Sequence, residues 1–307
     1  MTQTRTLLAA TDFSAPARHA LERAALLAQA HPEASLTLAH VVSRSALDTL
    51  RRMLPGDAAE LEAQLLSQAD KKLNELASNL ATNHGRTINT ELLQGTALTA
   101  LAGLVETRQI DLLVMGARGT HFMVELLLGS TTERVLSKTR RPLLAVKQRP
   151  QSPYQRILAP VDFSAHCAAA INTAHAWLPD ADFVLLHAFE VELESTFRFA
   201  GMNDDQIHEY RIQARSAAQV AMDAFIGTLN VPVRQLTRQF VHGAATLRIL
   251  EHEQTMDADL IVMGKHGQSV MEELLLGSVT KHVLSYSNSD VLIVSQTSRA
   301  SSSATRF

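Results

Sequence analysis

Asp111-Leu-Leu-Val-Met-Gly116-Ala-Arg-Gly119, continuing to Gly129-Ser130-Thr131, is the stretch around which this chain is organised. A second copy reads Asp259-Leu-Ile-Val-Met-Gly264-Lys-His-Gly267 and continues to Gly277-Ser278-Val279. In both copies two residues separate the first pair of glycines, and nine residues separate the second glycine from Gly-Ser. One short glycine motif is weak evidence, but the same spacing after two apolar runs indicates a shared function.

The chemistry of the motif favours an anionic ligand. The apolar run is typical of a buried parallel strand, and the glycines allow φ > 0 and a close approach to a ligand. Ser130 and Glu133 have the spacing of a capping box, which predicts a helix starting at Gly-Ser. The N-terminus of a helix offers unpaired N–H groups and a partial positive charge to an anion. The alternative is two tight turns that merely require glycine.

Composition excludes several classes of protein. The net charge of −3 divides into +3 for residues 1–150 and −6 for the remainder, and only 5% of the residues are aromatic. We therefore expect no nucleic-acid partner. The single cysteine, Cys167, excludes an internal disulfide and is expected to be a buried small side chain. Without an apolar leader or a run of transmembrane length, we expect a soluble, cytoplasmic protein with no membrane insertion.

Strand and helix patterns alternate along the first half. We expect strands at 6–10, 35–42, 87–93, 111–115 and 142–146, with helices starting after Ser14, at about Asp57, at Leu98 and after Gly129. The long amphipathic helix is expected to run from about Asp57 to Leu80. This order predicts an α/β fold with a doubly wound parallel sheet.

The order restarts after Arg149-Pro-Gln-Ser-Pro153, which we interpret as a linker. Asp162 follows Asp12 by 150 residues, His187 follows His40 by 147, and Gly264 follows Gly116 by 148. We therefore predict two homologous domains, at 1–148 and 154–296, and a disordered serine-rich tail at 297–307.

The chain resembles a tandem universal stress protein of the ATP-binding type. The resemblance rests on the Asp-Phe-Ser turn after the first strand, the second strand ending in His, and G-x-x-G-x9-G-[ST] after the fourth strand. It implies two five-stranded domains of the adenine nucleotide alpha hydrolase-like fold. It also implies that each domain binds ATP, ADP or AMP, with or without Mg²⁺, and that domains pair through their last strands.

The resemblance further implies the residues that hold the nucleotide. Asp12 and Asp162 should lie beside the adenosine, although an Asx turn is a compatible role for both. Val41 and Ala188 should lie near adenine, while Arg118 and Lys265 should either offset phosphate charge or be solvated. The complete predicted set is Ala10, Thr11, Asp12, Val41, Met115, Gly116, Arg118, Gly119, Gly129, Ser130 and Thr131 in the first domain, and Pro160, Val161, Asp162, Ala188, Met263, Gly264, Lys265, Gly267, Gly277, Ser278 and Val279 in the second.

One departure from the family pattern is acidic. Glu125, Glu272 and Glu273 stand where many ATP-binding members carry basic residues, and they would oppose binding if they faced the phosphates. We expect no metal site, because no Cys/His cluster has zinc-ligand spacing and the equivalent His40 and His187 suggest a shared structural role.

Other enzyme classes lack their motifs. G-x-G-x-x-G, G-x-x-x-x-G-K-[ST] and G-x-S-x-G are all absent, and we assign no catalytic residue. The favoured function is a nucleotide-dependent sensor or regulator of the stress response, with an unidentified downstream protein partner. The alternatives are a scaffold that binds no nucleotide, and a slow ATPase or autophosphorylating protein. We also expect the two domains to pair within the chain, with homodimerisation left open.

Overall fold

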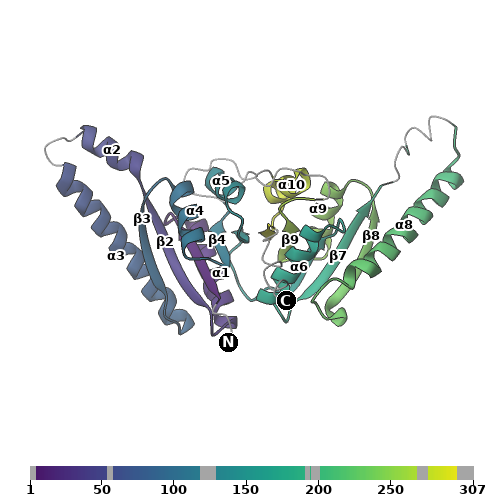
Figure 1. Cartoon of the computed structure of the whole chain (residues 1–307), viewed down its shortest axis with the longest axis horizontal. Helices are drawn as coiled ribbons and strands as arrows, with labels where there is room; N and C mark the ends of the chain where they lie inside the picture. Colours follow the sequence, from purple (N-terminus) through teal and green to yellow (C-terminus); the bar gives the residue numbers. More distant parts are fainter. Residues whose placement is uncertain are drawn as a thin grey trace, which may run out of the picture. The chain divides into compact units, whose positions relative to one another are not determined.

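The computed structural model describes residues 5–53, 58–117, 129–190, 194, 201–267 and 276–295 (Figure 1). The chain divides into two compact units, Met1–Pro153 and Tyr154–Phe307. Each unit is described by itself. The predicted tail at 297–307 lies outside the described residues.

Unit 1 is a five-stranded parallel sheet with helices on both faces. Its elements are β1 (Thr6–Thr11), α1 (Ala15–Ala30), β2 (Ser35–Ser43), α2 (Arg44–Met53), α3 (Ala58–His84), β3 (Asn89–Gly95), α4 (Ala97–Thr107), β4 (Leu112–Gly116), α5 (Ser130–Lys138) and β5 (Leu143–Val146). The strand order is β3-β2-β1-β4-β5, and every neighbouring pair is parallel. In Figure 1, α4 and α5 lie on one side of these strands and α1 and α3 pack on the sheet from the other.

Unit 2 repeats this arrangement. Its elements are β6 (Arg156–Pro160), α6 (Ala165–Trp177), β7 (Asp182–Phe189), α8 (Asp204–Ile226), the 3-10 turn η1 (Val233–Gln235), β8 (Leu236–His242), α9 (Ala245–Thr255), β9 (Leu260–Gly264), α10 (Ser278–Tyr286) and β10 (Asp290–Val294). The strand order is β10-β9-β6-β7-β8, again parallel. The predicted α/β fold with two five-stranded, doubly wound sheets is confirmed.

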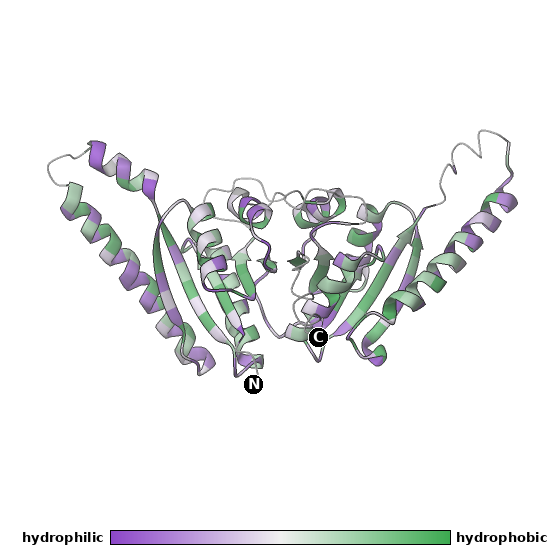
Figure 2. Ribbon diagram, in the orientation of Figure 1, coloured by the Kyte–Doolittle hydropathy of each residue, from purple (hydrophilic) through white to green (hydrophobic). Residues whose placement is uncertain are grey.

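The core of each unit lies along its central strands. Leu7 and Leu8 in β1, and Ile157 and Leu158 in β6, are completely buried, as a strand covered by helices on both faces requires. Figure 2 shows the same division, with the strands mostly hydrophobic and the long helices α3 and α8 carrying many hydrophilic positions. Burial of these strands supplies most of the driving force for folding.

One helix was not predicted. The predicted helix from Asp57 to Leu80 corresponds to α3, but α2 precedes it. The sequence of α2 is amphipathic, with apolar residues at helical spacing, so the helix was open to prediction. Among its described side chains, Leu47 is the one buried hydrophobic residue. α2 packs against α3 and the ends of β2 and β3, contacts that the local sequence does not reveal.

A crevice opens where the strand order reverses. β6 pairs with β9 at Ile157 and Leu158, although β6 continues to Pro160 and β9 to Gly264. Pro160 has no N–H group to extend a ladder of hydrogen bonds. Because ligands of open α/β sheets bind at the carboxyl ends of strands at such a reversal, this position is the expected ligand site of the unit.

Candidate functional site

The Asp-Phe-Ser turn after the first strand of each unit has one defined geometry. Asp162 Oδ1 accepts a hydrogen bond of 3.0 Å from the N–H of Ser164, and Asp12 Oδ1 accepts one of the same length from Ser14. The serine hydroxyl then accepts from the helix amide three residues later, at 3.1 Å from Cys167 and 3.2 Å from Ala17. The predicted Asx turn and the serine cap of the first helix are therefore both present.

A histidine packs beneath each turn. His187 Nδ1 lies 2.8 Å from the carbonyl oxygen of Val161, and its ring centroid is 4.4 Å from that of Phe163. In unit 1, His40 Nδ1 lies 2.7 Å from the carbonyl oxygen of Thr11. These contacts give both histidines the shared structural role that their equivalent positions predict. Burial lowers the pKa of His40, against the opposing effects of the Thr11 hydrogen bond and of Asp12.

The phenylalanine of the turn has a backbone conformation that side chains rarely adopt. Phe13 has φ of 66° and Phe163 has φ of 61°, both in the left-handed region. The histidine beneath each ring and the Asx hydrogen bond beside it hold this conformation in place. The turn directs the aspartate away from the strand at the mouth of the crevice.

Three hydrogen bonds organise the glycine motif in unit 2. The N–H of Lys265 donates to Val294 at 2.8 Å, and the N–H of Gly277 donates to the carbonyl of Lys265 at 3.0 Å. The hydroxyl of Thr280 donates to the carbonyl of Gly264 at 3.0 Å. These bonds join the end of β9 to the start of α10, across the nine residues that separate Gly267 from Gly277.

Unit 1 repeats the three bonds. The N–H of Ala117 donates to Val146 and the N–H of Gly129 donates to Ala117, each at 2.7 Å. The hydroxyl of Thr132 donates to Gly116 at 2.9 Å. Thr132 and Thr280 were not predicted, although their equal distance from the Gly-Ser pair in the two copies was a signal.

The motif glycines are required for space. Gly116 and Gly264 do not use the positive φ that glycine allows, since neither has a left-handed backbone. Among the described glycines, positive φ occurs at Gly85, Gly95, Gly201 and Gly243, and of these Gly95 and Gly243, with φ of 133° and 123°, lie where a strand passes into the following helix. A Cβ atom on Gly264 would instead lie 3.0 Å from Cβ of His166, so α6 packs directly on the backbone there.

Gly267 faces the aspartate of the turn. A Cβ atom added to it would lie 2.8 Å from Asp162 Oδ2, a separation that real Cβ atoms essentially never show. Gly277 is different, because its Cβ atom would meet only ordinary contacts, the nearest at 3.6 Å to the carbonyl of Lys265. The glycine backbone therefore does lie close to another group, as predicted, but at Gly267 that group is the side chain of Asp162.

The capping box predicted at Ser130 and Glu133 is wrong. α5 starts at Ser130 with Gly129 as its N-cap, and α10 starts at Ser278 with Gly277 as its N-cap, so the N-cap residue supplies no capping side chain to either helix. A glycine at this position does not occupy the amides of the first turn with a side-chain oxygen of its own. Such a terminus suits an anion.

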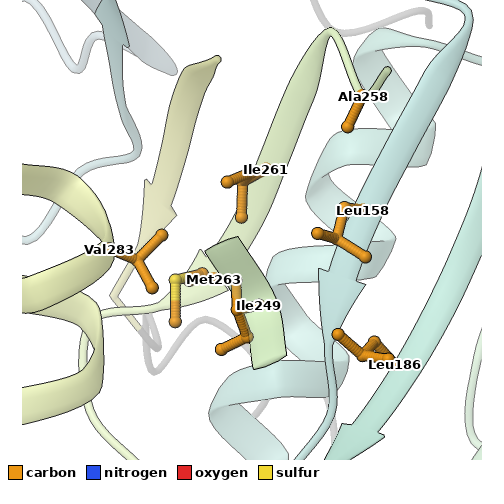
Figure 3. Close-up of a cluster of buried hydrophobic side chains, with 7 residues drawn as sticks. All are labelled: Leu158, Leu186, Ile249, Ala258, Ile261, Met263 and Val283. Atoms are coloured by element: carbon orange, nitrogen blue, oxygen red, sulfur yellow. The ribbon is translucent and has the colours of Figure 1, made fainter. Parts of the chain in front are cut away.

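These elements enclose a cavity of about 490 Å³ in unit 2. Leu186, Ile249 and Met263 belong to a buried cluster of β7, α9 and β9 side chains and also line the cavity, as Figure 3 shows for their positions in the core. The lining consists of Pro160, Val161, Asp162, Phe163, Cys167, Leu186, His187, Ala188, Ala245, Ile249, Met263, Gly264, His266, Gly267, Gly277, Ser278, Val279 and Thr280. One part is thus apolar, and another is formed by the glycine turn and the start of α10.

The cavity brings together all the predicted residues of unit 2 except one. Lys265 does not line it, and its side chain is only 1% exposed. The expectation that Lys265 is solvated is therefore wrong, while its role in offsetting phosphate charge stays a prediction. The neighbouring His266, which was not predicted, lines the cavity instead.

The predicted residues of unit 1 gather at the corresponding strand ends. Ala10, Thr11 and Met115 are buried at the ends of β1 and β4, while Asp12 and Thr131 are exposed. Val41 and Gly116 are half-buried, and Gly129 is buried. Arg118, Gly119, Glu125, Glu272 and Glu273 lie outside the described residues.

Cys167 is a buried side chain at the cavity wall, as predicted. Its thiol donates to the carbonyl of Pro160 at 3.3 Å. Burial, followed by the nearby charge of Asp162, raises the pKa of Cys167 to about 12. The group is therefore a neutral thiol at physiological pH and a poor nucleophile.

Within the described ranges, no three His, Cys, Asp or Glu side chains are grouped so that they could hold a metal ion. In the same part of the chain, no helix combines the length and the apolar character needed to cross a membrane.

Comparison with known proteins supplies the family. The model of the universal stress protein family matches residues 3–147 and again 153–295. The chain is 29% identical over 153 residues to universal stress protein MJ0577 of Methanocaldococcus jannaschii, covering 46% of this chain and 94% of that protein. It is 23% identical over 296 residues to a universal stress protein of Mycolicibacterium smegmatis, covering 94% and 96% of the two chains.

Solved structures agree on the fold. The crystal structure of a universal stress protein from Archaeoglobus fulgidus superimposes with a TM-score of 0.71 at 19% identity, over 96% of this chain and 100% of that one. Because the family model matches both halves of the repeat, this chain belongs to the universal stress protein family and carries two of its domains in tandem.

Proposed function

We propose that each domain binds an adenine nucleotide and that the protein acts as a nucleotide-dependent regulator in the stress response. The observation that carries the proposal is the cavity of unit 2, which is lined by ten of the eleven residues predicted for this domain. Its volume of about 490 Å³ lies within the range typical of small-molecule sites, roughly 300–1,000 Å³.

The two parts of the cavity suit the two ends of a nucleotide. Val161, Ala188 and Met263 offer an apolar surface to a purine ring. At the other part, Gly264, Gly267 and Gly277 expose backbone beside the start of α10, whose N-cap is a glycine. Backbone N–H groups and a helix N-terminus are suited to phosphate oxygens.

We propose binding, and not turnover, as the working event. Hydrolysis needs a base within hydrogen-bond reach of the attacking water. Of the described titratable groups on the cavity wall, Asp162 holds the Asx turn through Oδ1 and His187 contacts a backbone carbonyl through Nδ1. Cys167 is a neutral thiol, and the ring of His266 packs against that of His166. Slow ATP hydrolysis is the alternative. A sustained phosphate-releasing activity that stays with the protein through purification would favour it.

Titration calorimetry with ATP, ADP and AMP tests the proposal. We expect about two nucleotides per chain, because both halves carry the complete motif. Denaturing the purified protein and analysing the supernatant by mass spectrometry identifies any nucleotide already bound. No binding and no co-purified nucleotide would favour a scaffold that uses the domains without a ligand.

Two glycine variants make the test specific. Gly129→Val and Gly277→Val should each remove one binding event, since a branched side chain would occupy the space beside the start of the helix. Loss of two charge-assisted hydrogen bonds, each worth about 1.5–3 kcal/mol, weakens binding by well over tenfold. Gly103→Ala is the matched control, because Gly103 lies in α4 with open space around its Cβ position.

Pairing of the two domains through Leu143–Val146 and Val291–Val294 stays a prediction. Cysteine cross-linking between these strands in the full chain would test it, with the buried Cys167 replaced beforehand. Homodimerisation is tested separately by sedimentation.

A further inference from the structure

We propose that His266 is a phosphate-contacting side chain of the second domain and makes nucleotide affinity at that site depend on pH, an inference that rests on the proposed function. No comparable dependence is expected in the first domain, where arginine occupies the equivalent position. The two sites of one chain would then respond differently to acidification.

The equivalence of the two positions follows from the backbone. Ala117 and Lys265 each donate to the last residue of the neighbouring strand and each accept from the N-cap glycine of the next helix. The residue that follows is Arg118 in one copy and His266 in the other. The cationic side chain of this loop is therefore permanently charged in the first domain and titratable in the second.

His266 lies in the cavity wall between Gly264 and Gly267. It is 7% exposed, and its ring packs edge to face on that of His166, with 5.8 Å between centroids. His166 is fixed in turn, because its Cβ atom abuts the backbone of Gly264. His266 is thus a side chain held by packing at the glycine end of the cavity, where we place the phosphates.

The charged and titratable groups around His266 come from three directions. Asp162, just after β6, lines the same cavity as His266, and an incoming phosphate favours the imidazolium form of a ring that it contacts. His166 on α6 is in ring contact with His266, Lys265 precedes it in the chain, and Cys167 is neutral because burial raises its pKa to about 12. The first turn of α10, Ser278–Thr280, contributes no titratable side chain.

A bound phosphate shifts His266 toward its protonated form. Imidazole gains its charge near pH 6.5, and an anion in contact with the ring favours the charged form. The protein should therefore take up a proton on His266 when nucleotide binds at neutral pH. Affinity should rise as the pH falls from about 8 to 6.

The experiment uses the full chain carrying Gly129→Val, so that calorimetry reports the second domain. ATP affinity is measured from pH 5.5 to 8.5 for this protein and for His266→Gln and His266→Arg in the same background. Because all three bind the same ligand, the ratio of their dissociation constants cancels the ionisation of the phosphates. Adenosine, which lacks phosphate, is titrated as a second ligand.

We expect His266→Gln to weaken ATP binding about tenfold at pH 5.5 and little at pH 8.5, as loss of one charge-assisted contact requires. His266→Arg should remove the pH dependence, and adenosine should show none in any variant. A ratio for His266→Gln that stays constant with pH, while ATP still binds, would overturn this inference alone. Absence of ATP binding by the wild-type chain at every pH would overturn the proposed function with it.

Thermal unfolding of each variant guards against a structural explanation. If His266→Arg cannot be accommodated in its buried position, His266→Gln, which is of similar size, still gives the decisive ratio. A loss of affinity equal for ATP and adenosine would show that His266 acts through packing and would also overturn the inference.

Discussion

Replacing Gly267 by alanine should destabilise the second domain without any ligand being present. The added Cβ atom would lie 2.8 Å from Asp162 Oδ2, so either the loop or the carboxylate must shift. The carboxylate is held by the 3.0 Å hydrogen bond from Ser164 to Oδ1, which closes the turn before α6. Forcing one extra methyl group into a packed position costs about 1–3 kcal/mol.

Gly277→Ser provides the matched control. Its Cβ atom would meet only ordinary contacts, the nearest at 3.6 Å. Serine is also a favourable N-cap, so the start of α10 should change in stability by only a few tenths of a kcal/mol. The same serine hydroxyl would compete with phosphate for the amides of the first turn, and this variant should therefore bind ATP more weakly while folding normally.

The assay is urea unfolding of the full chain, monitored by circular dichroism. A reference variant with a substitution in the second domain identifies which unfolding transition belongs to that domain. A double-mutant cycle with Asp162→Ala isolates the contact. If the clash is responsible, Gly267→Ala should cost at least about 1 kcal/mol less once the carboxylate is absent. Equal costs of Gly267→Ala in the two backgrounds would refute the reasoning.

Three further predictions concern side chains that hold the site. Cys167 should resist iodoacetamide in the native protein at pH 8 and react on unfolding, because burial raises its pKa to about 12; rapid native labelling would contradict this. Thr280→Val should destabilise the second domain by about 1–3 kcal/mol, since the carbonyl of Gly264 loses a donor at a buried position; an unchanged urea midpoint would contradict it. Because burial lowers the pKa of His40, the unfolded chain takes up the proton first, so stability should be present above about pH 6.5 and decrease below it. His40→Gln should flatten this dependence of stability on pH. An unchanged slope would show that another titratable group causes it.

The sequence predicted what local patterns control. The strands of both sheets and the first and last helices of each unit follow from apolar runs, caps and the repeat. The Asx turn at Asp162 and the position of Ala188 in the cavity were predicted as well. In each case the residues that determine the local structure lie close together in the chain, or the same pattern recurs in the second copy of the repeat.

The wrong predictions concern contacts between distant segments. Glycine at position 264 indicated a close approach to a ligand, but one requirement for it comes from His166 on α6, which lies 98 residues earlier. Ser130 had the spacing of an N-cap, but α5 starts one residue earlier than that spacing implies, with Ser130 as its first residue and Gly129 as its N-cap. Lys265 had the right charge, but the direction of the loop buries it and places His266 in the cavity wall.

The repeat preserves a scaffold more closely than it preserves the ligand surface. Each domain keeps the aspartate of the Asx turn, the histidine beneath it and the threonine that reaches back to the first motif glycine. The positions around the expected ligand differ between the copies: Ala10 and Pro160, Thr11 and Val161, Thr131 and Val279, and Arg118 and His266.

These differences have physical consequences at each position. The hydroxyl of Thr11 accepts from the N–H of Phe13 at 3.0 Å, whereas Val161 offers only a methyl surface there. Thr131 presents a hydroxyl in the first turn of α5 where Val279 presents none in α10. Since the hydrogen bonds that shape the backbone are common to both domains, a difference in nucleotide affinity between the two sites would have to arise from these side chains and from the loop segments beside them.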